Sequence, residues 1–125
     1  MADQHATDVM KLTGDLFCGG YSNTAEEDIE KVALLHDAVE DGVLEIETIY
    51  NLYGETVAVA VDAISKRQGE TNKEYLKRCS ENVLAAKVKI ADGIVNMKRC
   101  IIDKDYSRAK YYCDRVGFML KLMEE

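Results

Sequence analysis

The sequence predicts an all-α domain of about six or seven helices, and three observations lead to this prediction. The 125 residues include no proline, the residue that most strongly interrupts helices. Ala, Leu, Glu and Lys are abundant, and all four favour helical structure. Alternating runs of β-branched residues, which would indicate strands, are missing.

Length and composition bound the class of protein. A chain of 125 residues with 47% apolar residues can form one globular domain with a hydrophobic core. No apolar run approaches the length of a membrane span, and the first residues do not resemble a secretory signal. The four cysteines form no CxxC pair, so we expect reduced thiols in a cytoplasmic protein. The net charge of −7 argues against binding to nucleic acid.

Apolar residues at helical spacing and helix-start signals place the elements in order. The first helix is expected over residues 3–17, and a glycine-containing loop follows over 18–23. A capping-box pattern over residues 24–27 predicts the start of a second helix, which should end near Gly42.

The remaining helices are predicted in the same way. Their expected ranges are 44–53, 55–66, a helix opened by a second capping box at 71–74, 82–102 and 105–123. The helix over 55–66 is apolar over a wide arc, which indicates a core position. In the last helix, Tyr111 and Tyr112 could stack on a base, but packing is the expected role.

The stretch over residues 34–42 places polar chemistry next to the predicted core. His36 and Asp37 directly follow an apolar run, and Glu40 and Asp41 come next. On a helix, His36 would share a face with Glu40, and Asp37 would share one with Asp41. Buried carboxylates need a cation or hydrogen bonds, and imidazole with carboxylate suits Mn, Fe, Zn or Mg-type ions. A metal site is one interpretation, and a solvated helix end is the other.

Two further residues could complete a metal site. Asp92 interrupts the apolar face of the predicted sixth helix. It is either satisfied by Lys89 or water, or directed into the core toward His36 and Asp37. His5 lies on the apolar side of the predicted first helix. Two His and two Asp from three helices would form a mixed nitrogen and oxygen site, with open positions where water becomes a nucleophile at neutral pH.

Three blocks of the sequence resemble the HD-domain phosphohydrolases. Residues 32–41 (VALLHDAVED) resemble the family's A-A-L-L-H-D-V-V-E-D block, and residues 88–97 (VKIADGIVNM) resemble V-K-L-A-D-x-x-x-N-M. Between them, residues 61–70 (VDAISKRQGE) resemble V-D-A-L-T-K-R-x-G-E of small bacterial members. The likeness is greatest to the hydrolase domain of RelA/SpoT-type alarmone enzymes and their small single-domain relatives. It implies an HD-domain helical bundle.

The resemblance also implies a role for each matching residue. Four residues match the family's metal ligands: His5, His36, Asp37 and Asp92. Glu40 and Asp41 match the acidic pair that orients or deprotonates the attacking water, and Asn96 matches the asparagine that lines the nucleotide site. The implied cofactor is one divalent ion, Mn²⁺ or similar. The implied reaction is metal-assisted removal of pyrophosphate from the 3′ position of (p)ppGpp-type nucleotides.

Departures from the family pattern keep other functions open. His5 lacks the proline of the family's H-P-x-x-V pattern, and only residues 1–4 precede it, where relatives carry a segment that helps hold the nucleotide. Position 93 is Gly, where many relatives have Arg. The alternatives are an HD phosphohydrolase for another nucleotide or phosphomonoester, and a degenerate HD domain serving as a non-catalytic binding or regulatory module. The expected partner is a small nucleotide, and a homodimer is left open.

Overall fold

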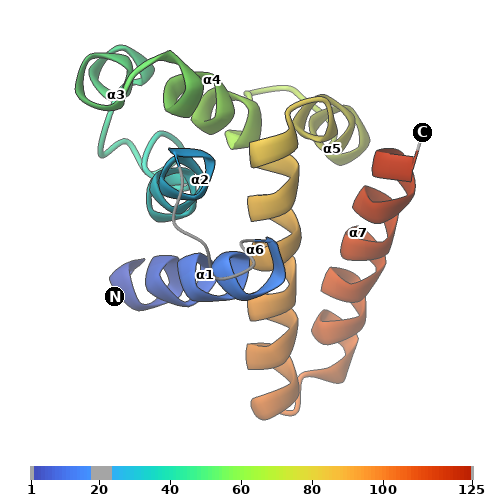
Figure 1. Cartoon of the computed structure of the whole chain (residues 1–125). Coiled ribbons are helices and arrows are strands. Elements are labelled where there is room, and N and C mark those ends of the chain that lie inside the picture. Colours follow the sequence, from blue (N-terminus) through green and yellow to red (C-terminus); the bar gives the residue numbers. More distant parts are fainter. Residues whose placement is uncertain (1, 18–23, 125) are drawn as a thin grey trace.

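The computed structural model describes residues 2–17 and 24–124, and every regular element within these ranges is an α-helix (Figure 1). The helices are α1 (Ala2–Phe17), α2 (Thr24–Leu35), α3 (Ile46–Tyr53), α4 (Glu55–Ile64), α5 (Asn72–Ser80), α6 (Val83–Ile102) and α7 (Tyr106–Glu124). The prediction of an all-α bundle of six or seven helices is confirmed. None of the described helices is both long enough and apolar enough to cross a membrane.

The bundle is organised around α6, against which α1, α2, α4, α5 and α7 all pack (Figure 1). α7 returns alongside α6 after a short turn, and α3 packs only against α4 among the described elements. Fully buried side chains come from several helices: Val9, Val32, Ile49, Val57, Val61, Cys79, Val88 and Met119. Each buried aliphatic side chain of this size contributes roughly 1.5–3 kcal/mol to folding. The core therefore lies along α6 and extends between α3 and α4.

The expectation that the second helix continues to Gly42 is wrong. α2 ends at Leu35, and a series of turns follows. The imidazole of His36 donates from Nδ1 to the carbonyl oxygen of Ala33, 2.6 Å away. In a continued helix, this carbonyl would accept the next backbone hydrogen bond. The amides of Val43 and Leu44 then both return to the carbonyl of Ala38. Residues 36–42 therefore form a compact turn that places the side chains of this stretch differently from a helix.

Other boundaries differ from the predicted ones by a few residues. The third helix begins at Ile46, and the fourth ends at Ile64 because Ser65 is extended, with φ −90° and ψ 119°. The second capping box is confirmed, since Thr71 and Glu74 each accept a hydrogen bond from the other's backbone amide. The loop predicted over 18–23 and the Thr24 side chain of the first capping box lie outside the described part of the structure.

Arg78 joins the end of α4 to the loop before α5. Its guanidinium donates to both carboxylate oxygens of Glu70, at 2.8 and 3.0 Å. It also donates to backbone carbonyls at the end of α4, including that of Ser65 at 2.8 Å. The Arg78 guanidinium and the backbone amide of Arg67 together lower the pKa of Glu70 to about 2.

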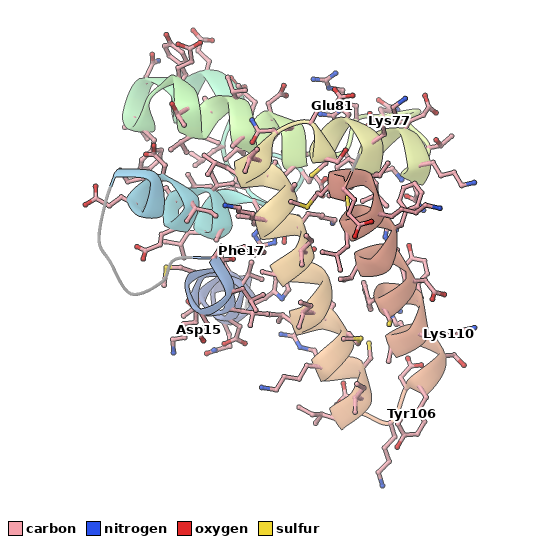
Figure 2. The ribbon with its side chains drawn as sticks, turned by 45° about the vertical axis from the view of Figure 1, so that its right-hand side comes forward. Asp15, Phe17, Lys77, Glu81, Tyr106 and Lys110 are labelled. Atoms are coloured by element: carbon pink, nitrogen blue, oxygen red, sulfur yellow. The ribbon has the colours of Figure 1, made fainter. Side chains whose placement is uncertain are left out.

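This pairing makes part of the stability of the fold depend on acid pH. Because the pKa of folded Glu70 lies below its ordinary value of 4.5, the contribution of the pair is present above pH 4.5 and is lost as the pH falls toward 2. Glu70→Gln is therefore expected to unfold at a lower temperature than the wild type at pH 7. The difference should narrow between pH 4.5 and pH 2 in thermal melts. Glu81→Gln is the matched control, because Glu81 is exposed and directly follows α5 (Figure 2); it should show no comparable pH-dependent difference in unfolding temperature. If the unfolding temperatures of Glu70→Gln and wild type differed by the same amount at every pH, the Glu70–Arg78 pair would not be the source of the pH dependence.

Candidate metal centre

Three helices bring polar side chains together inside the bundle. His5 comes from α1, His36 directly follows α2, and Asp92 lies midway along α6. His5 Nε2 is 2.7 Å from Asp92 Oδ1, although 87 positions separate the two residues in the sequence. His36 Nε2 is 3.2 Å from Asp37 Oδ2 and 3.4 Å from Asp92 Oδ1. The structure thus gathers all four residues that the sequence singles out as metal ligands.

Local structure explains how α1 aims His5 inward. His5, Val9 and Thr13 follow one another at intervals of four residues, so they lie along one face of the helix. Val9 and Thr13 are fully buried, and the Thr13 hydroxyl donates to the carbonyl of Val9. Because α1 packs against both α2 and α6, this buried face carries His5 to the junction of the three helices.

The orientation of His36 is fixed by its backbone contact. A carbonyl oxygen can only accept, so Nδ1 of His36 must carry the proton that it donates to Ala33. In the neutral imidazole, Nε2 then carries the lone pair, and this atom is the one that faces Asp37 and Asp92. Metal-binding histidines commonly donate their second ring N–H to a carbonyl or carboxylate in this way.

The donor set fits a cation. One ligand atom from each of His5, His36 and Asp37 lies within 4.8 Å of the other two, and Asp92 contacts both histidines. His36 Nε2 and His5 Nδ1 are buried and have no hydrogen-bond partner among the described residues. Lone pairs of nitrogen and carboxylate oxygen that converge in a buried site repel one another unless a proton or a metal ion lies between them.

Protonation equilibria reflect the same convergence. Burial alone would lower the pKa of His36, but the carboxylates of Asp37 and Asp92 outweigh burial and raise it to about 10. The pKa of Asp92 is held far below its ordinary range, since His36, His5 and Lys89 outweigh the opposite effect of burial. His36 also lowers the pKa of Asp37. Without a metal, a proton on His36 therefore balances the carboxylates.

The two acidic residues predicted to handle the attacking water, Glu40 and Asp41, lie in different surroundings. Asp41 lines a small pocket of about 200 Å³ together with His36 and Asp37, so it faces the same space as two of the predicted ligands. The Glu40 carboxylate instead accepts a hydrogen bond from the backbone amide of Lys66, just beyond α4. Of the two acids, Asp41 has the better access to a water molecule beside the histidines.

A second pocket, of about 280 Å³, opens from Asp92 between α6 and α7. Asn96, for which the family resemblance implies a place in a nucleotide site, lines this pocket, and its amide nitrogen lies 3.4 Å from Asp92 Oδ1. The charged residues of the lining are Lys89, Arg108 and Arg115 against Asp92, which is three positive charges and one negative, or +2. In a chain of net charge −7, the lining of this pocket is a local concentration of positive charge, which would attract an anion.

Sequence reasoning missed the contribution of α7. Six residues of this helix line the pocket, and four of them are basic or aromatic: Arg108, Tyr111, Tyr112 and Arg115. Their spacing of three, four and seven residues places them on one face, and this was the signal available in the sequence. The Arg115 guanidinium lies over the ring of Tyr111, 5.2 Å from its centroid, and donates to its hydroxyl. The tyrosines therefore border a cavity rather than serving only to pack the last helix.

No protein-family model matches the chain, and no curated protein matches its sequence.

Proposed function

We propose that this protein is a metal-dependent hydrolase of a nucleotide phosphate ester, of the HD-domain type, with a (p)ppGpp-like 3′-pyrophosphate ester as the favoured substrate. The observation that carries the proposal is the convergence of His5, His36, Asp37 and Asp92 beside a positive pocket. A cation site next to an anion site suits metal-assisted hydrolysis of a phosphate ester. The resemblance of residues 32–41 and 88–97 to the HD blocks supports the same class.

The four ligand candidates would hold one divalent ion, Mn²⁺ or similar, through two nitrogens and two carboxylates. Such an ion, when bound, polarises a phosphoryl oxygen and makes water more acidic. The protein's own residues supply the remaining requirements. Asp41 can accept a proton from water in the pocket that it shares with His36 and Asp37, and the Ala33 carbonyl keeps His36 in the orientation that binding needs.

The pocket between α6 and α7 suits the organic part of a nucleotide as well as its charge. Arg108 and Arg115 offer guanidinium groups, which match phosphate in geometry. Tyr111 and Tyr112 provide aromatic surface at the same wall, and Asn96 offers an amide that can pair with a base or a ribose. This combination favours a phosphorylated nucleoside over a simple inorganic phosphate.

The test is Mn²⁺-dependent release of pyrophosphate from ppGpp by the wild type and by Asp37→Ala. The variant is expected to lose roughly 100-fold or more of the activity, because it removes a ligand at the half-exposed side of the site. Asp62→Ala is the control, since Asp62 forms an exposed ion pair with Arg67 away from the site. It should retain nearly all activity.

Three results would change the assignment. Mn²⁺ binding without ppGpp turnover would shift the substrate to another nucleotide or a phosphomonoester, which a panel of nucleoside monophosphates and diphosphates would identify. Equal activity in Asp37→Ala and wild type would contradict the metal site. A wild type that neither binds Mn²⁺ nor hydrolyses any member of the panel would leave the non-catalytic module as the function.

A further inference from the structure

Lys89 belongs to both the candidate metal centre and the pocket between α6 and α7. Its Nζ is 3.2 Å from Oδ2 of Asp92, and its side chain lines the pocket. The two oxygens of Asp92 therefore have different surroundings. Oδ1 faces His5, His36 and the amide of Asn96, whereas Oδ2 faces the ammonium group.

The ammonium group is fixed in place at the inner end of the pocket. The Lys89 side chain is only 21% exposed, and its Nζ lies 5.3 Å from the centre of the Tyr75 ring. Tyr75 is itself buried, and its hydroxyl donates to the carbonyl of Ile64. A cation held over an aromatic ring and against one carboxylate oxygen loses little further freedom when it binds a ligand.

Asp92 does not use all the donors of this group. A lysine ammonium has three N–H donors; a single oxygen of Asp92 takes one, and the hydroxyl of Tyr75 takes a second, which leaves one for a ligand. Arg108 is more exposed, and Arg115 is already engaged by Tyr111. Because charge interactions strengthen as water is excluded, the partly buried Lys89 is the cation on which an anion in the inner pocket would depend most.

We propose that Lys89 is a substrate-contacting residue that binds a phosphoryl oxygen at the inner end of the pocket between α6 and α7. The inference deepens the proposed function and rests on it for the identity of the substrate. It assigns Lys89 to the phosphate or pyrophosphate group that lies next to Asp92. Arg108 and Arg115 then face the more distant parts of the ligand.

The experiment measures pyrophosphate binding to the metal-free protein by isothermal titration calorimetry. Lys89→Met should bind pyrophosphate roughly tenfold or more weakly than the wild type, which corresponds to the loss of one hydrogen bond to a charged group. Lys87→Met is the matched control on the same helix. The Lys87 ammonium lies over the ring of Phe17, the residue labelled at the end of α1 in Figure 2. Lys87 does not line the pocket, and its substitution should leave the affinity within about twofold.

A second comparison separates direct contact from an effect through Asp92. The alternative is that Lys89 never touches the anion and acts solely by neutralising the Asp92 carboxylate. Replacing Lys89 should then have no effect on pyrophosphate affinity once Asp92 is Asn. The same titration is therefore also run on Asp92→Asn and on the double variant Asp92→Asn, Lys89→Met. A loss of roughly tenfold in both backgrounds supports direct contact. If Lys89→Met weakens pyrophosphate binding only in the protein that keeps Asp92, the proposal of direct contact is overturned.

A third measurement needs no substitution and so does not depend on the folding of a variant. NMR of the lysine ammonium groups in the wild type should show the Lys89 signal shifting during a pyrophosphate titration, while the Lys87 signal stays in place. An unchanged Lys89 signal at saturation, or the absence of pyrophosphate binding, would overturn the proposal. Binding through Lys89 in a protein that hydrolyses no nucleotide would preserve this inference and contradict only the proposed function.

Discussion

Under the proposed function, replacing Asp92 by Asn should weaken Mn²⁺ binding by roughly 100-fold or more and reduce phosphate-ester hydrolysis to a similar extent. Asn has the same shape, so the change removes the charge without opening a cavity. Among the four candidate ligands, Asp92 is the one whose loss of charge should matter most, because one of its oxygens contacts both histidines and the other contacts Lys89. Calorimetric titration with Mn²⁺ and the hydrolysis assay measure the two effects separately.

The same substitution has a consequence in the metal-free protein. The pKa of His36 is about 10 in the presence of Asp37 and Asp92, above its ordinary value of 6.5. A raised pKa in the folded state means that the contribution to stability is complete below pH 6.5 and is lost as the pH rises toward 10. The metal-free wild type should therefore lose thermal stability over this range, and Asp92→Asn should lose less because its His36 has a lower pKa. NMR titration of the imidazole reports the pKa directly.

Asp62→Asn is the matched control for both measurements. It removes one carboxylate from an exposed ion pair with Arg67, which contributes at most about 1 kcal/mol to stability. Neither the Mn²⁺ affinity nor the titration of His36 should change. An Asp92→Asn protein that binds Mn²⁺ within about threefold of the wild type would show that Asp92 is not a ligand.

Gly93→Ala is expected to destabilise the protein by about 1–2 kcal/mol, although alanine normally strengthens a helix by about 1 kcal/mol over glycine. A Cβ atom at position 93 would lie 2.6 Å from Cγ2 of Val116 on α7, closer than carbon atoms approach without movement. Val116 is β-branched and has few side-chain conformations, so it cannot turn away at low cost. Denaturant unfolding, followed by circular dichroism, measures the net change.

Two companion variants test the cause. Gly117→Ala lies next to Val116 on α7, but its added carbon meets nothing within 4 Å, so it should stabilise the protein by roughly 0.5–1 kcal/mol. Adding Val116→Ala to Gly93→Ala should recover part of the loss, because the clashing methyl group is gone. If Gly93→Ala proves as stable as Gly117→Ala, close packing of α6 on α7 does not require glycine at position 93.

The close approach at Gly93 also bears on the pocket. Gly93 and Val116 both line the cavity between α6 and α7, which contains Lys89 and the arginines of α7. Here the absent side chain lets α7 approach, and α7 itself brings Arg108 and Arg115 to the pocket.

The sequence by itself determined the all-α fold and most helix boundaries to within a few residues. These properties depend on local signals such as apolar spacing and the Thr71 capping box, which are fully contained in neighbouring residues. It also identified His36, Asp37 and Asp92 as candidates, because charged or polar groups on otherwise apolar segments stand out in the pattern. The end of α2 was misplaced, since the His36 side chain takes part in ending the helix and apolar spacing does not report such a contact.

Only the tertiary structure decided which of these residues meet. The 2.7 Å contact of His5 with Asp92, the position of Glu40 against the Lys66 amide and the pocket formed by α6 with α7 all join segments that are distant in the sequence. Apolar periodicity shows which side of each helix is buried, but the distance between two buried sides depends on how the helices cross and how closely they pack. That packing is set by details such as the missing side chain at Gly93, whose partner on α7 the sequence does not reveal.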